Sequence, residues 1–186
     1  MPRLSVSTLL RTALATVLLV TPTFAQSAST GATADEVMAQ LKSEAATQHK
    51  NILLMFGASW CGNCHLFDRF LADPTIHPLM DKTFVFADLA SGEQKNDKRH
   101  ANIPGGPELQ TSLGGGKAGF PYLVMLDASG APLANSIAPK TGNIGYPDSA
   151  QEIDWFMEML KKAAPSLSAD EMKTVKKWLR AHSTKP

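Results

Sequence analysis

The sequence predicts one α/β domain, a sandwich in which helices cover a central mixed β-sheet. Three short apolar runs, at 52–56, 84–87 and 122–126, have the character of buried strands, and segments with helical periodicity precede and separate them. The third run leads into a turn and a further strand, so a hairpin follows the alternation of strands and helices. The length of 186 residues, with 44% hydrophobic and 19% charged residues, suits one globular domain.

Residues 1–25 are predicted to be a secretory signal peptide. Arg3 and Arg11 come before an apolar run at 13–20, and small residues lead to a predicted cleavage site after Ala25. A membrane-spanning helix needs about 20 apolar residues, so the run is too short, and an uncleaved anchor is the weaker alternative. The sequence therefore predicts export, most simply to the periplasm, with no membrane span after cleavage.

The Ser- and Thr-containing stretch 26–33 is predicted to be a flexible linker, and the folded domain is expected to span 34–186. A capping box formed by Thr33 and Glu36 predicts the start of a helix over 34–48, because the Thr and Glu side chains satisfy free backbone N–H groups there.

The apolar run 52–56 does not alternate with polar residues, which is typical of a strand buried on both faces. A helix is predicted directly after it, over 61–71, and a second strand over 84–87. The polar, glycine-rich stretch 90–118 predicts a long loop that holds one short helix near 108–113.

After the strand at 122–126, a turn at 127–130 and an antiparallel partner strand at 133–138 are predicted. Capping boxes that begin at Ser149 and Ser168 predict two C-terminal helices. The apolar stripes of these helices are expected to pack in the core. The alternative is that the last helix docks a partner.

Only two cysteines occur, Cys61 and Cys64, too few for a framework of structural disulfides. Cys61 comes where a buried strand is predicted to turn into a helix, and the N-terminus of a helix stabilises a thiolate. Cys64 follows one helical turn later, within reach of the first sulfur. One thiol can therefore attack a substrate disulfide while the other resolves the mixed disulfide. A static disulfide or two inert buried thiols are the alternatives.

The string Ala-Ser-Trp-Cys-Gly-Asn-Cys at 58–64 follows an apolar strand, and Gly119-Phe120-Pro121 precedes another. At these residues the chain resembles the thioredoxin superfamily, over about 51–138 and a helix after it. The resemblance implies a thioredoxin-like domain over 34–186 with extra C-terminal helices. It also implies a thiol–disulfide oxidoreductase that needs no dissociable cofactor and acts on protein dithiols and disulfides.

The same resemblance assigns roles to individual residues. Cys61 would be the nucleophile and Cys64 the resolving thiol, and the two would form the redox-active disulfide. Trp60 would be a surface platform beside them, while Phe120 and a cis Pro121 would align an extended substrate. We also expect Cys61 to be the exposed cysteine and Cys64 the buried one.

The chain departs from thioredoxins proper in ways that resemble secreted thioredoxin-like proteins. Met55 occupies the strand position of the family's buried acid, so the usual proton acceptor for the resolving thiol is missing. Deprotonation of Cys64 is then expected to depend on water or on His65, whose free pKa is about 6.5. The alternative is that His65 is only a solvated residue of the first helical turn.

Two rival functions use the same residues. Cys61-x-x-Cys64-His65 is also a c-type haem attachment string, with His65 as the proximal ligand. However, this string lies at a strand–helix junction of an α/β chain, whereas a small cytochrome is mainly helical. Cys61, Cys64 and His65 could instead hold a soft ion such as Cu(I) or Zn, as in a copper chaperone, but no fourth ligand is evident. We therefore predict no metal site.

The predicted partners are protein substrates and a redox partner that recharges the cysteine pair, and the protein is expected to be a monomer. A net charge of +1 gives no basic surface for nucleic acid. The cluster Lys95, Lys98, Arg99 and His100 is interpreted as a solvated loop that could also border the active site.

Overall fold

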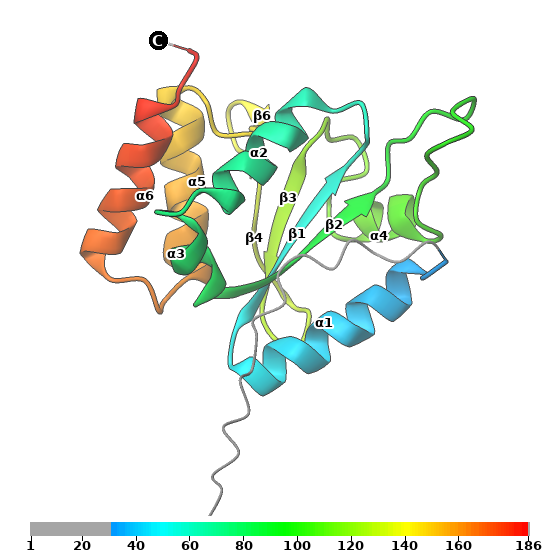
Figure 1. Ribbon diagram of the computed structural model, residues 1–186, viewed down its shortest axis with the longest axis horizontal. Coiled ribbons are helices and arrows are strands. Elements are labelled where there is room, and N and C mark those ends of the chain that lie inside the picture. Colours follow the sequence, from blue (N-terminus) through cyan, green and yellow to red (C-terminus); the bar gives the residue numbers. More distant parts are fainter. Residues whose placement is uncertain (1–30, 186) are drawn as a thin grey trace, which may run out of the picture.

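A mixed four-stranded sheet in the order β2–β1–β3–β4 forms the centre of the computed structural model (Figure 1). Strand β1 (Asn51–Gly57) pairs in parallel with β2 (Phe84–Ala90) and antiparallel with β3 (Tyr122–Leu126). Strand β4 (Pro132–Asn135) pairs antiparallel with β3 and forms the opposite edge from β2. The predicted mixed sheet is confirmed, and the strands predicted at 52–56 and 122–126 are its two central strands.

The structure describes residues 31–185, so the predicted signal peptide and the first part of the predicted linker lie outside the described residues. Helices cover both faces of the sheet, with α1 on one side and α2, α5 and α6 on the other (Figure 1). The helices are α1 (Ala34–Gln48), α2 (Gly62–Ala72), α3 (His77–Asp81), α4 (Gly106–Ser112), α5 (Ala150–Ala163) and α6 (Ala169–Ala181). Between residues 31 and 185, none of these helices combines the length and apolarity needed to cross a bilayer.

Strand β1 contributes to two separate hydrophobic clusters. Leu53 and Met55 pack with the layer of α2 and α5, whereas Ile52, Leu54 and Phe56 pack with α1. All five side chains are fully buried. Because successive side chains of a strand point to opposite faces, an uninterrupted apolar run is what a strand between two helical layers requires.

The C-terminal helices α5 and α6 belong to the hydrophobic cluster that contains Leu53 and Met55. Phe156 of α5 is fully buried and meets the rings of Phe67 and Phe70 of α2 edge to face, at centroid distances of 6.0 and 5.8 Å. Trp178 of α6 packs on Phe70 at 5.3 Å. The prediction that the terminal stripes form core is confirmed, and the Trp178 ring lies against α2 rather than free for a partner.

Two elements differ from the prediction. The strand expected over 133–138 divides, because β5 (Ile137–Ala138) leaves the sheet and pairs with β6 (Gly142–Asn143). At the division, the hydroxyl of the buried Ser136 accepts a hydrogen bond from Leu123 N and so substitutes for a backbone carbonyl. Short helix α3 was not predicted, and five residues give too little periodicity to reveal it.

Replacing Phe156 by Ala should lower the free energy of unfolding by about 3–5 kcal/mol, because it removes a buried ring and leaves a cavity between α2 and α5. Denaturant titration measures this loss. The matched control is Glu158→Ala on the same helix, whose side chain is 51% exposed and should change stability by about 0.5 kcal/mol or less. A loss below about 1 kcal/mol for Phe156→Ala would show that α5 is not part of the core.

Candidate active site

The two cysteines form a disulfide at the junction of β1 and α2. The S–S distance is 2.08 Å and the Cα atoms are 5.2 Å apart. Cys61 is the N-cap of α2, and its sulfur accepts a hydrogen bond from Cys64 N at 3.1 Å. On reduction, the free N–H groups and the dipole of the helix N-terminus stabilise negative charge on this sulfur. The arrangement therefore favours Cys61 as the thiolate of the pair.

Both cysteines are buried in the oxidised protein, with exposed fractions of 4% for Cys61 and 3% for Cys64. The expectation that Cys61 is clearly the exposed one is wrong for this state. The reason is the N-cap geometry, which turns the Cys61 sulfur back over the first helical turn toward Cys64. Position on the helix, rather than exposure, distinguishes the two sulfurs.

Trp60 and the segment before β3 form a wall beside the disulfide. Trp60 is 54% exposed and is the one large hydrophobic side chain between residues 31 and 185 that is exposed to this degree. Its Nε1 donates to Gly92 O at 2.9 Å, and its ring meets the Phe120 ring edge to face at 5.9 Å. The Phe120–Pro121 peptide bond is cis, and Pro121 is buried. The structure thus places the Phe120 ring, and with it the cis bond to Pro121, against Trp60, which directly precedes Cys61.

Asn143 of β6 holds the Pro121 segment in place. Its side-chain amide donates to Gly119 O at 2.6 Å and to Pro121 O at 3.0 Å, and its oxygen accepts from Ser136 Oγ. The sequence analysis did not select Asn143, because its role depends on the β5–β6 hairpin, which a two-residue strand pair does not signal.

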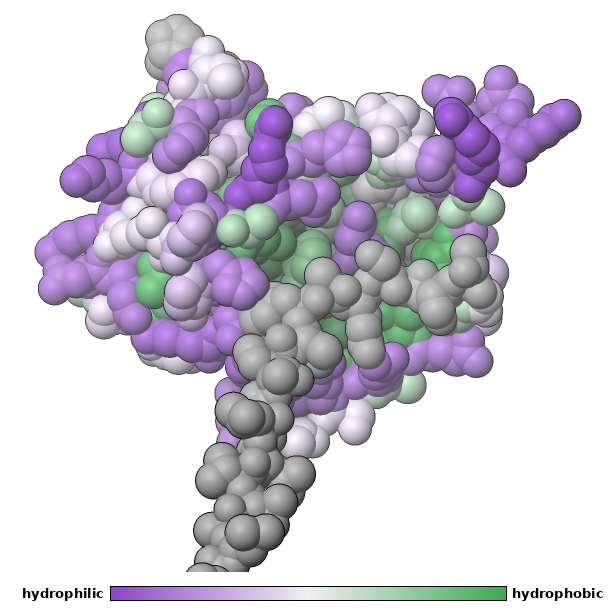
Figure 2. Space-filling model, in the orientation of Figure 1, coloured by the Kyte–Doolittle hydropathy of each residue, from purple (hydrophilic) through white to green (hydrophobic). Residues whose placement is uncertain are grey.

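Glu93 ties the loop after β2 to the turn that carries the cysteines. Its carboxylate accepts from Ser59 N at 2.6 Å and from Ser59 Oγ at 2.8 Å. Its own N–H bonds Asn102 across the loop. The base of the loop at Glu93 therefore borders the site, while the loop itself projects as a hydrophilic protrusion (Figures 1 and 2). Within the part of the chain that the structure describes, no hydrogen bond or ion pair joins the basic cluster to the cysteine turn, so its place beside the site stays a prediction.

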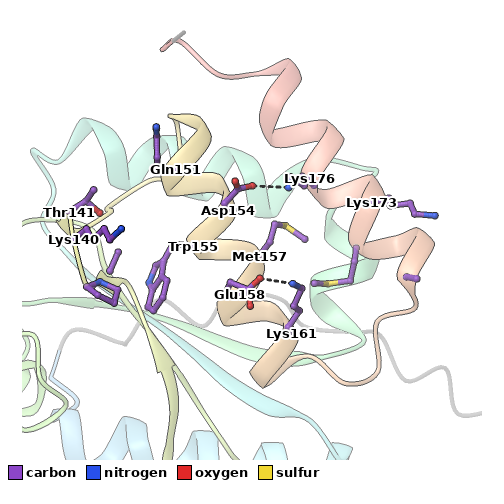
Figure 3. A pocket seen from close by; sticks show the side chains of 14 residues that line it. Lys140, Thr141, Gln151, Asp154, Trp155, Met157, Glu158, Lys161, Lys173 and Lys176 are labelled. Carbon is purple, nitrogen blue, oxygen red and sulfur yellow. Dashed lines mark hydrogen bonds and ion pairs between the residues drawn. The ribbon is translucent and has the colours of Figure 1, made fainter.

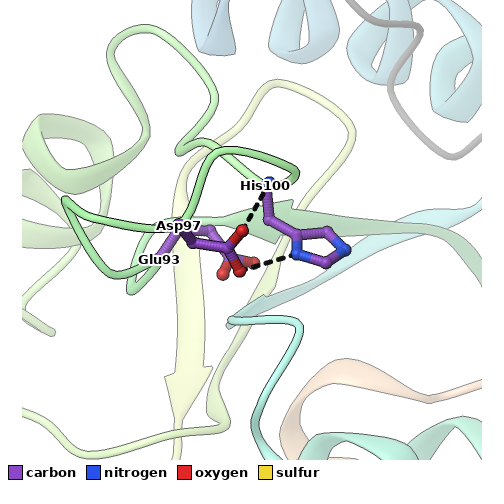
Figure 4. A group of neighbouring side chains, drawn as sticks. All are labelled: Glu93, Asp97 and His100. Atoms are coloured by element: carbon purple, nitrogen blue, oxygen red, sulfur yellow. Dashed lines mark hydrogen bonds and ion pairs between the residues drawn. The ribbon is translucent and has the colours of Figure 1, made fainter.

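Glu93, Asp97 and His100 are the one group of three metal-ligating side chains found between residues 31 and 185, with their ligand atoms within 4.8 Å of one another (Figure 4). Asp97 already bonds His100 Nδ1 at 2.8 Å and accepts from the backbone N–H of Arg99 and His100. These hydrogen bonds explain the position of the Asp97 carboxylate, which stabilises the conformation of the loop. Cys61 and Cys64 are not members of this group.

His65 lies on the first turn of α2, but neither of its ring nitrogens is directed at a cysteine sulfur. Nε2 donates to Ser59 O at 3.1 Å, since a carbonyl can only accept, and Nδ1 lies 3.8 Å from an Asp68 carboxylate oxygen. The side chain is 59% exposed. This geometry favours the interpretation of His65 as a solvated first-turn residue over that of a proton donor or haem ligand.

The carboxylate of Asp88 lies near Cys64, and the sequence analysis missed it. A methyl group placed on Gly57 would lie 2.9 Å from Cys64 Sγ and 3.6 Å from Asp88 Oδ1, so both atoms border the space that the glycine leaves open. Loss of water around Asp88 and, secondarily, the Asp68 carboxylate raise the pKa of Asp88 to about 6. The signal was present, because Phe84, Phe86 and Asp88 alternate along one face of the strand, but the predicted strand stopped at residue 87.

Comparison with known families decides what kind of protein carries this site. The profile of the family described as thioredoxin-like matches residues 34–128, about half of the chain, from α1 to the end of β3. The chain belongs to the thioredoxin-like family. The predicted family and its fold, a mixed sheet with flanking helices and extra helices at the C-terminal end, are confirmed.

Solved structures similar to this thioredoxin-like chain include a disulphide isomerase from Xylella fastidiosa Temecula1, 19% identical over 81% of this chain and 91% of that chain, with a TM-score of 0.49. DsbH oxidoreductase is 24% identical over 66% of this chain and 81% of that chain, with a TM-score of 0.48. The oxidised C-terminal domain of Neisseria meningitidis DsbD is 21% identical over 67% and 93%, with a TM-score of 0.42. Comparison with the curated proteins finds no match.

A groove of about 730 Å³ lies elsewhere on this thioredoxin-like domain, between α5, α6 and the β5–β6 hairpin (Figure 3). Two ion pairs cross or border it, Lys176 with Asp154 at 2.7 Å and Lys161 with Glu158. None of the predicted site residues lines it. The groove is therefore separate from the disulfide site. In each of the two ion pairs, the carboxylate balances the charge of its lysine partner.

Asp88→Asn should stabilise the oxidised protein increasingly as the pH rises from 3.8 to about 6, with a constant difference above that. The raised pKa means that the folded protein holds this proton more tightly than the unfolded chain, so wild type loses stability across this window and the neutral amide does not. Denaturant titration of both proteins at several pH values measures the difference.

Glu171→Gln is the control of opposite sign. Mainly a hydrogen bond from Lys82 lowers the pKa of Glu171 to about 2, so wild type should gain stability over this variant between pH 2 and 4.5. An Asp88→Asn difference that stays flat between pH 3.8 and 6 would contradict the raised pKa.

Proposed function

We propose that this protein is an exported thiol–disulfide oxidoreductase that exchanges disulfides with protein substrates through Cys61 and Cys64. The observation that carries the proposal is the disulfide at the N-terminus of α2, with the Cys61 sulfur as the helix cap. A reversible disulfide needs one sulfur stabilised as a thiolate and a second within bonding distance, and this turn supplies both. No dissociable cofactor is required, because the cysteine pair carries the electrons.

The reaction proceeds in two exchanges. In the reduced protein the Cys61 thiolate attacks a client disulfide, which forms a mixed disulfide and releases one client thiolate. Cys64 then attacks the Cys61 sulfur, which restores the Cys61–Cys64 disulfide and releases the second client thiolate. The same steps in reverse oxidise a client dithiol. A redox partner resets the pair, and the predicted location is the periplasm.

The surface around the disulfide suits a protein client. Trp60 offers an exposed ring beside the cysteine turn, and Phe120 supports that ring from the Pro121 segment. Exposed aromatic rings give a client a large apolar contact area. We therefore assign Trp60, Phe120 and Pro121 to client binding, and Cys61 and Cys64 to chemistry, in a protein that acts as a monomer.

The haem and soft-metal functions are less compatible with this geometry. In the disulfide, neither sulfur is free to form a thioether or to bind a metal as a thiolate. His65 directs its nitrogens to Ser59 O and Asp68. Purified protein should accordingly be colourless, and a Soret band from covalently retained haem would overturn the proposed function.

Cys64→Ala should trap clients as long-lived mixed disulfides at Cys61, because the resolving sulfur is gone and only slow external thiols can release them. Cys61→Ala is the matched control and should trap none, because it lacks the attacking thiolate. Non-reducing gels and mass spectrometry of the trapped species, expressed with the intact N-terminus and recovered from the periplasm, measure both variants.

The assignment of roles fails if Cys61→Ala is the variant that traps clients. It also fails if alkylation of the reduced wild type near neutral pH labels Cys64 before Cys61. If neither variant traps a client and reduced wild type leaves insulin disulfides intact, the proposed oxidoreductase function is wrong.

A further inference from the structure

The proposed exchange requires a thiolate at Cys64, and the surroundings of this residue make its proton hard to lose. Cys64 is 3% exposed, so its thiol has little direct access to bulk water. The neighbouring Met55 is fully buried and carries no acceptor for a proton. His65 directs its ring nitrogens elsewhere. An acceptor group supplied by the protein must therefore come from another element.

Asp88 lies across a glycine from the Cys64 sulfur. The register of the parallel pair places Asp88 opposite Met55 and Ala90 opposite Gly57, so Asp88 belongs to the face of the sheet that α2 covers. Gly57 has no side chain, and the position of its missing methyl group is 2.9 Å from Cys64 Sγ and 3.6 Å from Asp88 Oδ1. Both atoms therefore border the same space, and β1 places no side chain in it.

We propose that Asp88 is the group that takes the proton from Cys64 when Cys64 resolves the mixed disulfide. As the S–S bond between Cys64 and Cys61 forms, the bond between Cys61 and the client sulfur breaks, and the client leaves as a thiolate. The cysteine pair is oxidised, the client disulfide is reduced, and the Cys64 proton resides on Asp88. In the reverse reaction protonated Asp88 returns the proton to the departing Cys64 sulfur.

The charged groups around Asp88 adapt it to this task. Desolvation, followed by Asp68 of α2, raises the pKa of Asp88 to about 6, Glu93 acts in the same direction, and His65 of α2 opposes them. A free thiol has a pKa of about 8.5, so a carboxylate at 6 accepts its proton with less penalty than one at 3.8. Asp88 nevertheless remains largely ionised at neutral pH and so available as a base.

Asp88 also gives the proton a way out. It is an exposed residue of β2, while its neighbours Ala87 and Leu89 are buried. The residue therefore keeps contact with solvent although its carboxylate is partly desolvated, and Oδ1 borders the space that Gly57 leaves open beside the Cys64 sulfur. A proton taken from Cys64 can pass on to water, and the acceptor is ready for the next cycle.

Ellman's reagent, added to the reduced full-length protein, allows the rates of the two exchanges to be measured separately. At equimolar reagent, the attack of Cys61 releases a first nitrothiobenzoate, and the attack of Cys64 on the adduct releases a second. Asp88→Asn should leave the first rate within about twofold of wild type and slow the second roughly 100-fold at pH 7, the usual size of general-base assistance. In wild type, the rate of the second phase should increase with pH around pH 6, and this increase should be absent from Asp88→Asn.

Further variants test the carboxylate itself. Asp88→Ser is a second neutral variant and should show the same slow second phase, whereas Asp88→Glu retains a carboxylate and should recover much of the rate. Asp68→Asn removes a like charge and should move the rise toward lower pH. Asp154→Asn, whose carboxylate pairs with Lys176 on α5 and α6, should match wild type in both phases.

The inference is overturned if the second phases of Asp88→Asn and Asp88→Ser overlay wild type at every pH. It is equally overturned if both phases slow by the same factor, since a proton acceptor for Cys64 acts only on the second. The failure of the proposed function looks different, because wild type would then leave insulin disulfides intact and Cys64→Ala would trap no client, whatever the two rates with Ellman's reagent.

Discussion

The burial of β1 between two helical layers holds the disulfide turn in a fixed relation to the rest of the domain. A shift of one residue would turn Leu53 and Met55 toward α1 and move the opposite set into the α2 layer, so the pairing register is strongly determined. That register in turn sets which residues of β2 and β3 meet the end of β1. Asp88 of β2 borders the space beside the Cys64 sulfur, and Pro121 comes directly before β3.

Short polar contacts then connect three loops around the disulfide. Ser59 is held by Glu93, Trp60 by Gly92 O, and the Pro121 carbonyl by Asn143. Each contact satisfies a backbone or indole group that would otherwise lose hydrogen bonds at the edge of the core. The indole N–H of Trp60 is thus paired, while its ring stays exposed as a hydrophobic surface.

With the proposed role of Asp88, the placement of the carboxylate reconciles core stability with proton transfer. A carboxylate at the fully buried Met55 would lose its hydration with no cationic partner, which is costly. On β2, Asp88 is an exposed residue, and its Oδ1 borders the space that Gly57 leaves open. The apolar surface of β1 stays continuous, while a base of raised pKa remains beside the sulfur.

The sequence by itself determined the main helices and strands and the cysteine pair. Three local signals carried this information: uninterrupted apolar runs, capping boxes and the Cys61-Gly-Asn-Cys64 spacing. Such signals can be recognised without knowledge of the fold. Only the tertiary structure decided that Asp88 lies beside Cys64, that Glu93 and Asn143 hold the surrounding loops, and that both cysteines are buried in the disulfide state. These features depend on strand register and on contacts between residues far apart in the chain, which no local pattern encodes.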